Sequence, residues 1–265
     1  MLEVVKAHAF GNDFLFVGEN CIRPDDAPLV ARRLCDRHAG IGGDGLVLHA
    51  PTPRGASFRL LNADGSPSEL SGNGVRCLAA IVAHSDPSAR EGTVIEIDSD
   101  AGVKALTLIA RDKSRILFRA AMGHPTDIGR VALENVGGEQ LNAVVLRVGN
   151  PQCVILGGTL TEERMHRLGP AIENHSYFPA RTNVEFAVVD DPGHVRILIW
   201  ERGVGPTLSS GTGSCAAAVA AATYGGASRD VEVIAPGGRQ RVEWTSEGLF
   251  LTGWAEVLFR AQWLA

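Results

Sequence analysis

The stretch Ser71-Gly72-Asn73-Gly74-Val75-Arg76-Cys77 occurs a second time, with changes, as Ser210-Gly211-Thr212-Gly213-Ser214-Cys215. The two serines are 139 residues apart, about half of the 265-residue chain. Small apolar residues follow each copy, which predicts that each copy opens a helix, over 72–84 and 211–224. A helix N-terminus carries unpaired N–H groups and the positive end of the helix dipole, so it attracts a carboxylate or phosphate. The repeat therefore predicts two similar halves that bring two such helix ends to one cleft.

The rest of the chain is dominated by β signals. Val, Ile and Leu alternate with polar residues between Gly, Asp and Pro turns, which predicts strands at 57–61, 92–97, 104–109, 115–119, 143–148, 183–189, 195–200, 230–235, 240–244 and 249–252. Two further helices are predicted, at 27–37 and 161–172. The second motif helix has Ala or Val at every position of 216–222, which is typical of a helix buried on all sides. The predicted fold is α/β, of the α+β type, with two pseudo-symmetric halves (1–118 and 119–265), each a mostly antiparallel sheet wrapped around a central helix.

Composition excludes several classes of function. A net charge of −5 and 6% aromatic residues argue against a nucleic acid or an anionic membrane as the partner. The sequence has no apolar run approaching the roughly 18 residues of a membrane span and no signal-peptide pattern, which predicts a cytoplasmic protein. Five widely spaced cysteines indicate reduced thiols. There is no metal-ligand spacing, no P-loop and no dinucleotide fingerprint, so we expect no metal and no cofactor.

Polar residues punctuate the predicted strands. Four asparagines lie at or near strand ends, and a Glu–Arg pair follows another strand: Asn12, Asn62, Asn150, Asn183 and Glu201–Arg202. Taken singly, each cluster is explained by turn formation, which Asn, Asp and Gly favour. Taken together, the amides suit a molecule that bears both an ammonium and a carboxylate, and an arginine can pair bidentately with a carboxylate. The set predicts a polar cage for a small amino acid.

The chain resembles the diaminopimelate epimerase family, in the proline-racemase-like group of cofactor-independent amino-acid isomerases. The resemblance covers essentially the whole chain and rests on motifs in one order: 10–14 (FGNDF), 36–38 (DRH) with 40–42 (GIG), 62–66 (NADGS), 72–77 (GNGVRC), 149–151 (GNP), 182–183 (TN), 201–203 (ERG) and 211–213 (GTG). It implies two pseudo-symmetric halves with a substrate cleft between them. It also implies an isomerase of lysine and cell-wall biosynthesis, and a homodimer is plausible for the family.

The resemblance implies a role for each site residue. In the family one side chain removes the α-proton as a thiolate, and an opposed thiol delivers a proton to the other face. Gly72, Asn73, Gly211 and Thr212 are implied to hold the α-carboxylate and α-amino end of the substrate. The remainder of the diaminopimelate is implied to contact Asn12, Asn62, Asn150, Asn183, Glu201 and Arg202.

Three positions depart from the family pattern. The two catalytic cysteines correspond to Ser71 and Ser210, and Gln152 stands where the family usually has histidine. A thiol has a pKa of about 8.5 that a helix N-terminus lowers further, whereas an alcohol is far less acidic. Cys77 and Cys215 are expected to lie inside their helices, away from the N-terminal ends. Three changes around one site favour natural divergence over the alternative, a deliberate Cys→Ser replacement.

Three functions follow. The leading prediction is a diaminopimelate epimerase or close homologue that interconverts LL- and meso-diaminopimelate through Ser71 and Ser210. The second is a diverged member of the superfamily, a dehydratase or double-bond isomerase acting on another small acid. The third is a non-catalytic amino-acid-binding protein that retains the cage without the chemistry.

Overall fold

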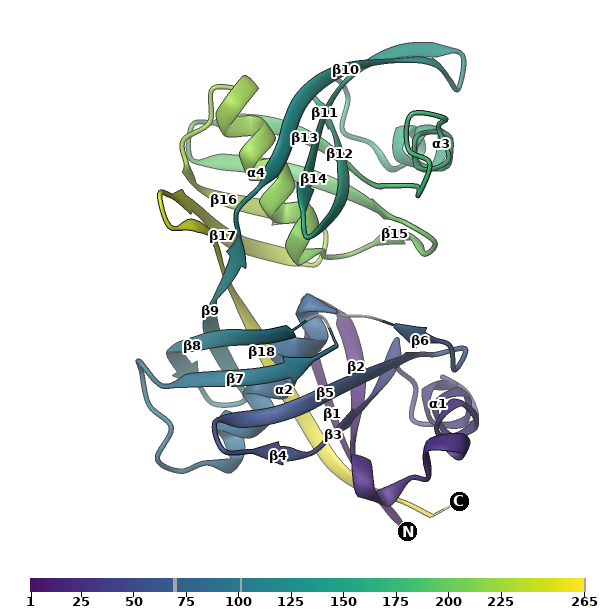
Figure 1. The fold of residues 1–265 in the computed structure, drawn as a ribbon, viewed down its shortest axis with the longest axis vertical. Coiled ribbons are helices and arrows are strands. Elements are labelled where there is room, and N and C mark those ends of the chain that lie inside the picture. The colour runs from purple at the N-terminus through teal and green to yellow at the C-terminus, as the bar shows by residue number, and fades with distance from the viewer. Residues whose placement is uncertain (69–70, 101, 265) are drawn as a thin grey trace. The chain divides into compact units, whose positions relative to one another are not determined.

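The computed structural model describes residues 1–68, 71–100 and 102–264. The chain divides into two compact units (Figure 1). Unit 1 comprises Met1–Ala120 and Gly253–Ala265, and unit 2 comprises Ala121–Thr252. The sequence division into 1–118 and 119–265 differs from these units in two respects: the boundary falls after Ala120, and the last strand is shared between the units. The last strand, β18 (Gly248–Trp263), begins in unit 2 but pairs from Glu256 to Trp263 with β1 (Leu2–Ala9), so residues 253–265 pack with unit 1.

Unit 1 is a sheet that closes around one helix. Besides β1, its strands are β2 (Asn12–Gly18), β3 (Gly45–His49), β4 (Pro51–Thr52), β5 (Gly55–Asn62), β6 (Pro67–Ser68), β7 (Val94–Ser99), β8 (Gly102–Asp112) and β9 (Arg115–Gly123). Its helices are the short 3-10 turns η1 (Glu19–Cys21) and η2 (Pro24–Asp26) and the α-helices α1 (Ala27–Cys35) and α2 (Gly72–Ser85). Pairings run from β1 through β2, β3, β5, β7, β8 and β9 to β18, which returns to β1.

Unit 2 repeats this arrangement with its own helix. Its strands are β10 (Thr126–Val136), β11 (Glu139–Val148), β12 (Asn150–Leu156), β13 (Asn183–Asp191), β14 (His194–Glu201), β15 (Gly205–Thr207), β16 (Asp230–Ala235) and β17 (Gly238–Thr245). Its helices are α3 (Glu162–Glu173) and α4 (Gly211–Tyr224). Strand β17 pairs antiparallel with the first part of β18.

The internal repeat is visible in the strand pairings. In unit 1 the succession β1–β2–β3–β5–β7–β8 is antiparallel, parallel, antiparallel, parallel and antiparallel. In unit 2 the succession β11–β12–β13–β14–β16–β17 follows the same order. A parallel pair needs a crossover connection, and α1 and α2 supply the two crossovers of unit 1 as α3 and α4 do in unit 2. The predicted pseudo-symmetric α+β fold is confirmed.

Both motif helices are buried, as expected from their mainly apolar sequences. In α2 every residue from Asn73 to Ile81 is buried, and in α4 every residue from Gly213 to Ala221 is buried. Small side chains let the surrounding strands approach the helix closely, while the sheet supplies the larger apolar groups. Separate apolar clusters surround α2 and α4, and two more lie under α1 and α3. Each unit therefore packs its sheet around its motif helix along most of the length of that helix.

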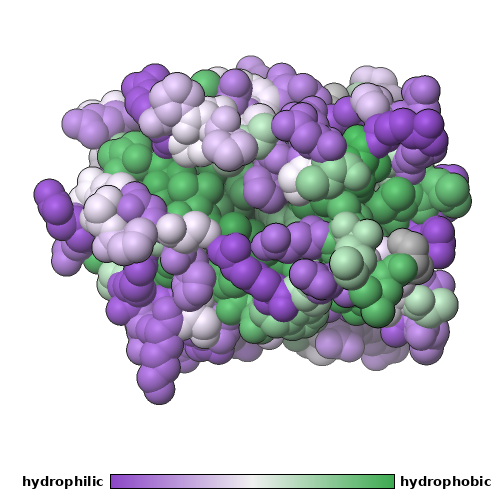
Figure 2. Space-filling view, turned by 90° about the horizontal axis from the view of Figure 1, so that it is seen from below, coloured by the Kyte–Doolittle hydropathy of each residue, from purple (hydrophilic) through white to green (hydrophobic). Residues whose placement is uncertain are grey.

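Some apolar side chains reach the surface. Figure 2 shows one face on which apolar side chains (green) form a band bordered by polar ones (purple). The exposed large apolar residues of the described chain are Met1, Leu29, Val94, Val103, Tyr177, Val204, Leu208, Leu258, Phe259 and Leu264. The homodimer stays a prediction. Among the described residues, no helix combines the length and apolar character needed to cross a membrane.

Candidate functional site

Ser71 caps α2 in unit 1. Its backbone is extended, with φ −125° and ψ 119°, and its Oγ accepts a hydrogen bond from the Gly74 N–H at 3.1 Å. A serine cap of this kind stabilises a helix by about 1 kcal/mol. The cap engages one lone pair of the hydroxyl oxygen and leaves its O–H able to donate. Ser71 therefore stands at the N-terminal end of α2, where an anion is favoured.

A directed chain of hydrogen bonds sets the amides beside this cap. The Arg76 guanidinium donates to Asn73 Oδ1 (3.2 Å), Asn73 Nδ2 donates to Asn12 Oδ1 (3.3 Å), and Asn12 Nδ2 donates to Asp44 Oδ2 (2.7 Å). Arginine can only donate and an ionised aspartate can only accept, so the two ends fix the orientation of both amides. The structure thus brings two of the predicted site residues, Asn12 and Asn73, into contact, and their role toward a substrate stays a prediction.

Charged groups hold the far end of this chain in place. Asp13 is bound by Arg37 through two hydrogen bonds (2.7 and 3.2 Å) and by the Lys6 ammonium (2.8 Å), and Arg37 also contacts Asp44 (2.8 Å). Burial alone raises the pKa of Asp13, but the hydrogen bonds and charges of Arg37 and Lys6 outweigh it, so this pKa lies below its ordinary value. The network fixes the turn from which Asn12 projects.

Asn62 stands apart from this group. It is exposed at the end of β5, and its Nδ2 donates to Ser66 Oγ at 2.9 Å while its backbone N–H donates to the Ser66 carbonyl. These contacts close the 62–66 turn, as the turn explanation of this motif expects. A substrate contact for Asn62 stays a prediction.

Ser210 repeats in unit 2 the arrangement of Ser71. Its Oγ accepts from the Gly213 N–H at 3.2 Å, and the residue is 6% exposed. Gly211 and Thr212 are the first two residues of α4, the places that Gly72 and Asn73 occupy in α2. The repeated motif therefore has the same local structure in both units.

The asparagines also occupy equivalent places. Asn12 opens β2 and Asn150 opens β12, and each follows a glycine with positive φ, Gly11 at 88° and Gly149 at 74°. Glycine adopts this left-handed conformation at little cost, so each turn aims the next side chain reproducibly. The repeat therefore includes strand ends as well as helix ends.

Gln152 is the centre of the polar cluster in unit 2. Its side chain is 1% exposed, and one terminal atom of its amide lies 2.5 Å from Asn150 Oδ1, 3.1 Å from Thr212 Oγ1 and 3.3 Å from Asn183 Nδ2. The other terminal atom lies 2.9 Å from Oε1 of Glu185. The structure thus brings together four of the predicted residues: Asn150, Gln152, Asn183 and Thr212.

Glu185 is a buried acid that the sequence analysis missed. It is 0% exposed, and burial, followed by the charge of Glu201, raises its pKa well above the ordinary value. Burial and Glu185 likewise raise the pKa of the Cys153 thiol. Strand periodicity could have identified Glu185, because it lies two residues after Asn183 and so shares the same face of β13. Asp44 and Arg76 were missed as well, since each was read only as part of a longer motif.

The Glu201–Arg202 turn is fixed by its own partners. The backbone N–H of Arg202 donates to Asn183 Oδ1 (2.9 Å), and its guanidinium donates to the Ala180 carbonyl (3.1 Å). Buried Glu173 accepts from the Gly203 N–H and from Trp200 Nε1, both at 2.8 Å. The turn therefore presents Arg202 at the surface beside Asn183.

Four of the five cysteines are buried, and Cys21 is exposed. Cys77 and Cys215 are 0% exposed inside α2 and α4, as expected, and burial raises the pKa of the Cys77 thiol. In the ranges 1–68, 71–100 and 102–264, no group of three His, Cys, Asp or Glu side chains is placed to hold a metal.

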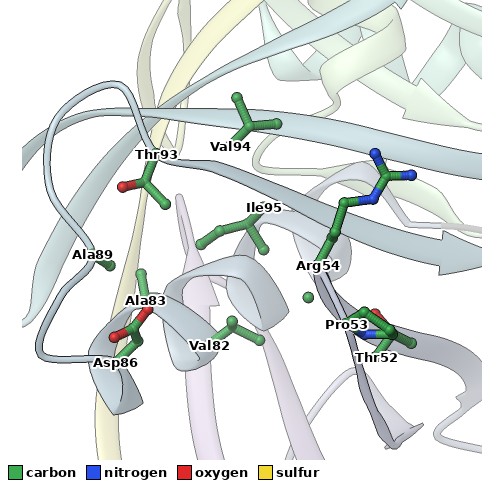
Figure 3. A pocket seen from close by; sticks show the side chains of 11 residues that line it. Thr52, Pro53, Arg54, Val82, Ala83, Asp86, Ala89, Thr93, Val94 and Ile95 are labelled. Carbon is green, nitrogen blue, oxygen red and sulfur yellow. The ribbon is translucent and has the colours of Figure 1, made fainter.

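A pocket of about 400 Å³ lies elsewhere in unit 1 (Figure 3). Val82 and Ala83 line it from the C-terminal part of α2, and Arg54, Val94 and Ile95 line it from the sheet side. Arg54 is already paired with Glu96 at 2.9 Å. Because Ser71 is at the opposite end of α2, this pocket is separate from the predicted site.

Two repeats of a sheet around a buried helix, each helix capped by the same motif, define the racemase and epimerase class of fold. A predicted epimerase from Pseudomonas aeruginosa has this fold, with a TM-score of 0.74 and 15% identity over 100% of both chains. The sequence model of the family described as diaminopimelate epimerase matches residues 4–127 and 144–258.

Curated relatives match along their whole length. This chain is 39% identical to the diaminopimelate epimerase of Desulforudis audaxviator (strain MP104C), over 99% of both chains. It is 37% identical to the diaminopimelate epimerase of Desulfitobacterium hafniense (strain DSM 10664 / DCB-2), over 98% of this chain and 97% of that one. The chain belongs to the diaminopimelate epimerase family.

Proposed function

We propose that this chain interconverts LL- and meso-diaminopimelate, with Ser71 and Ser210 as the two groups that exchange the α-proton. The observation that carries the proposal is the repeated cap. Each serine closes the first turn of a buried helix in the same way, at the two positions where the family resemblance implies the reacting groups. The full-length identity to curated epimerases supports the substrate.

The proposed binding contacts follow from the donors and acceptors present. The first N–H groups of α2 and α4, with the Ser71 and Ser210 hydroxyls, favour a carboxylate. The amides of Asn12, Asn73, Asn150, Asn183 and Gln152 offer both N–H donors and carbonyl acceptors, as a zwitterion requires. We also propose substrate contacts for Asn62, Gly72, Glu201, Arg202, Gly211 and Thr212.

The serine pair sets the expected rate. A hydroxyl ionises far less readily than a thiol, so proton abstraction by serine is slow unless a neighbouring group assists it. The positive ends of α2 and α4 stabilise negative charge on the substrate carboxylate as the α-proton leaves. The proposal is therefore a slow epimerase, without a cofactor, in cytoplasmic lysine and cell-wall biosynthesis.

A second candidate is an amino-acid-binding protein without catalysis. It is favoured by one observation, that serine stands at both helix caps and glutamine at position 152, and none of these three side chains titrates near neutral pH. Such a protein binds diaminopimelate without exchanging any carbon-bound proton. The diverged dehydratase or isomerase has no comparable support.

Calorimetric titration tests the substrate assignment. Meso- and LL-diaminopimelate are expected to bind, and L-lysine, which lacks the second carboxylate, is expected to bind at least about tenfold more weakly, since an unmatched buried polar site costs 1–3 kcal/mol. If neither isomer binds, both candidates are refuted. If the isomers bind, exchange of the α-proton with solvent distinguishes the epimerase from the binding protein.

A further inference from the structure

Glu173 is a buried acid at an unfavourable place in its helix. It is the last residue of α3, and it is 5% exposed. The C-terminal end of a helix carries partial negative charge, which disfavours a carboxylate, and the burial of a charge adds a further cost. The carboxylate of Glu173 therefore does not stabilise α3 itself, and its benefit comes from the groups that it binds outside the helix.

These groups are three hydrogen-bond donors from two other segments of unit 2. One carboxylate oxygen, Oε1, accepts from the Gly203 N–H at 2.8 Å and from Arg181 Nη1 at 3.0 Å. The other oxygen, Oε2, accepts from Trp200 Nε1 at 2.8 Å. Each of these nitrogens can only donate, so a side chain with acceptor oxygens on both sides is needed to satisfy all three. The guanidinium of Arg181 also compensates the buried charge.

The helix is shaped to receive Trp200. Gly169 lies one turn before Glu173 on the same face of α3. A Cβ built at Gly169 would lie 2.7 Å from Trp200 Cδ2, so the indole packs directly on the backbone of α3. The missing side chain at position 169 therefore allows the close approach that brings the indole N–H to Glu173.

The segments that Glu173 anchors carry two of the predicted substrate contacts. Arg181 lies two residues before Asn183, and Gly203 directly follows Arg202. Both anchored residues have a left-handed backbone, with φ 58° at Arg181 and 76° at Gly203, and this conformation is costly for a residue with a Cβ. The segments also meet directly, because the Arg202 N–H donates to Asn183 Oδ1 at 2.9 Å. Glu173 therefore ties together the backbone on both sides of this bond.

The side chain of Arg202 depends on the same anchor. Arg202 is exposed, and its guanidinium donates to the Ala180 carbonyl at 3.1 Å. Ala180 directly precedes Arg181, so this carbonyl belongs to a segment that Glu173 anchors. A guanidinium has five N–H donors in a planar fork, which suits bidentate binding of a carboxylate.

We propose that Glu173 is a positioning residue that sets the specificity of the site for a second carboxylate. It holds in place the two turns that carry Asn183 and Arg202, and these two side chains bind that carboxylate. An amino acid with a carboxylate at each end is therefore preferred over one whose far end has only an ammonium. The identity of the ligand rests on the proposed function, whereas the anchoring of the 201–203 turn by Glu173 does not.

Calorimetric titration of the full chain with meso-diaminopimelate and with L-lysine, which lacks the second carboxylate, tests the specificity. Glu173→Ala and Glu173→Leu both remove the acceptor oxygens, the first leaving space and the second filling it. Each is expected to lower the affinity for meso-diaminopimelate at least about tenfold, and to change the affinity for L-lysine less than about twofold. If one variant does not fold, the other decides.

Two variants of α3 supply controls. Ile172→Val loosens the buried packing next to Glu173 but keeps the carboxylate, and Glu163→Gln removes an exposed charge from the same helix. Both are expected to keep the wild-type ratio of the two affinities. If the Glu173 variants also keep this ratio, or lose affinity for both ligands equally, Glu173 has only a structural role and the specificity role is overturned.

Amide hydrogen exchange tests the anchoring without a ligand. The N–H groups of Arg202 and Gly203 are expected to exchange at least about tenfold faster in the Glu173 variants, relative to the amides of β16, and at the wild-type rate in Ile172→Val. Unchanged exchange at these two amides would overturn the proposal. If wild type binds neither meso-diaminopimelate nor L-lysine, the proposed function fails, and hydrogen exchange alone decides whether Glu173 holds the turn.

Discussion

Replacing Gly213 by alanine probes how tightly Glu185 is packed against the first turn of α4. The added methyl would lie 2.6 Å from Glu185 Oε1 and 3.2 Å from the Cβ of Ser210, both closer than van der Waals contact. Overpacking a buried site costs about 1–3 kcal/mol. Displacing Glu185 from Gln152 costs a further 1–3 kcal/mol or so, and alanine returns up to about 1 kcal/mol through helix propensity. The expected net loss in the free energy of unfolding is about 1–6 kcal/mol.

Two glycines in the first turn of α2 supply controls: Gly74, which is equivalent to Gly213, and Gly72, whose surroundings are open. A Cβ at Gly72 meets no described atom within 4 Å, so Gly72→Ala is expected to be neutral or stabilising by less than about 1 kcal/mol. A Cβ at Gly74 lies 3.2 Å from the Phe58 ring, a milder contact, so Gly74→Ala is expected to fall between the other two. Urea denaturation followed by tryptophan fluorescence measures all three. Gly213→Ala as stable as Gly72→Ala would refute the view that Glu185 is locked in place.

Three further results are expected. Changing Ser71 and Ser210 together to cysteine is expected to increase the rate of α-proton exchange about 100-fold or more, because general acid–base catalysis contributes roughly 10²–10⁴-fold and thiols ionise more readily than alcohols. Equal exchange rates for wild type and the double variant, measured by NMR, would contradict this. The lowered pKa of Asp13 means that its stabilising contribution is present above the unfolded pKa of about 3.9 and is lost as pH falls through the lower folded value. The urea midpoint of wild type is therefore expected to fall more steeply on acidification than that of Asp13→Asn, and parallel curves would count against the Asp13 network. Glu173→Ala leaves the partly buried Trp200 and Gly203 N–H groups without their acceptor and is expected to cost about 1–3 kcal/mol in total, measured by urea denaturation; a loss under about 0.5 kcal/mol would show that the turn does not need Glu173.

The features predicted best from the sequence are those with a strong periodic or compositional signal. The helices expected at 72–84 and 211–224 are observed at Gly72–Ser85 and Gly211–Tyr224, because each follows a serine-glycine cap and runs through mainly apolar residues. Alternating segments such as 230–235 are strands as expected. Strand β2 was not predicted, because residues 13–17 are buried on both faces and so show no alternation.

Two features depend on tertiary contacts that the sequence does not display. The return of residues 253–265 to unit 1 follows from pairing with β1, across nearly the whole chain. A single glutamate in a strand ordinarily suggests a solvent-facing position, yet Glu185 is buried because Gln152 and α4 enclose it. The equivalence of Ser71 and Ser210, by contrast, could be predicted from the repeated motif, because helix capping depends on residues that are close in the sequence.

Proton NMR of LL- and meso-diaminopimelate incubated with the protein in D₂O tests the central claim most directly. The account predicts that the α-proton signal of both isomers decays and that each isomer gives rise to the other, more slowly than with the Ser71→Cys, Ser210→Cys protein. An α-proton signal that stays unchanged at high protein concentration, while both isomers bind, would contradict the epimerase and leave an amino-acid-binding protein.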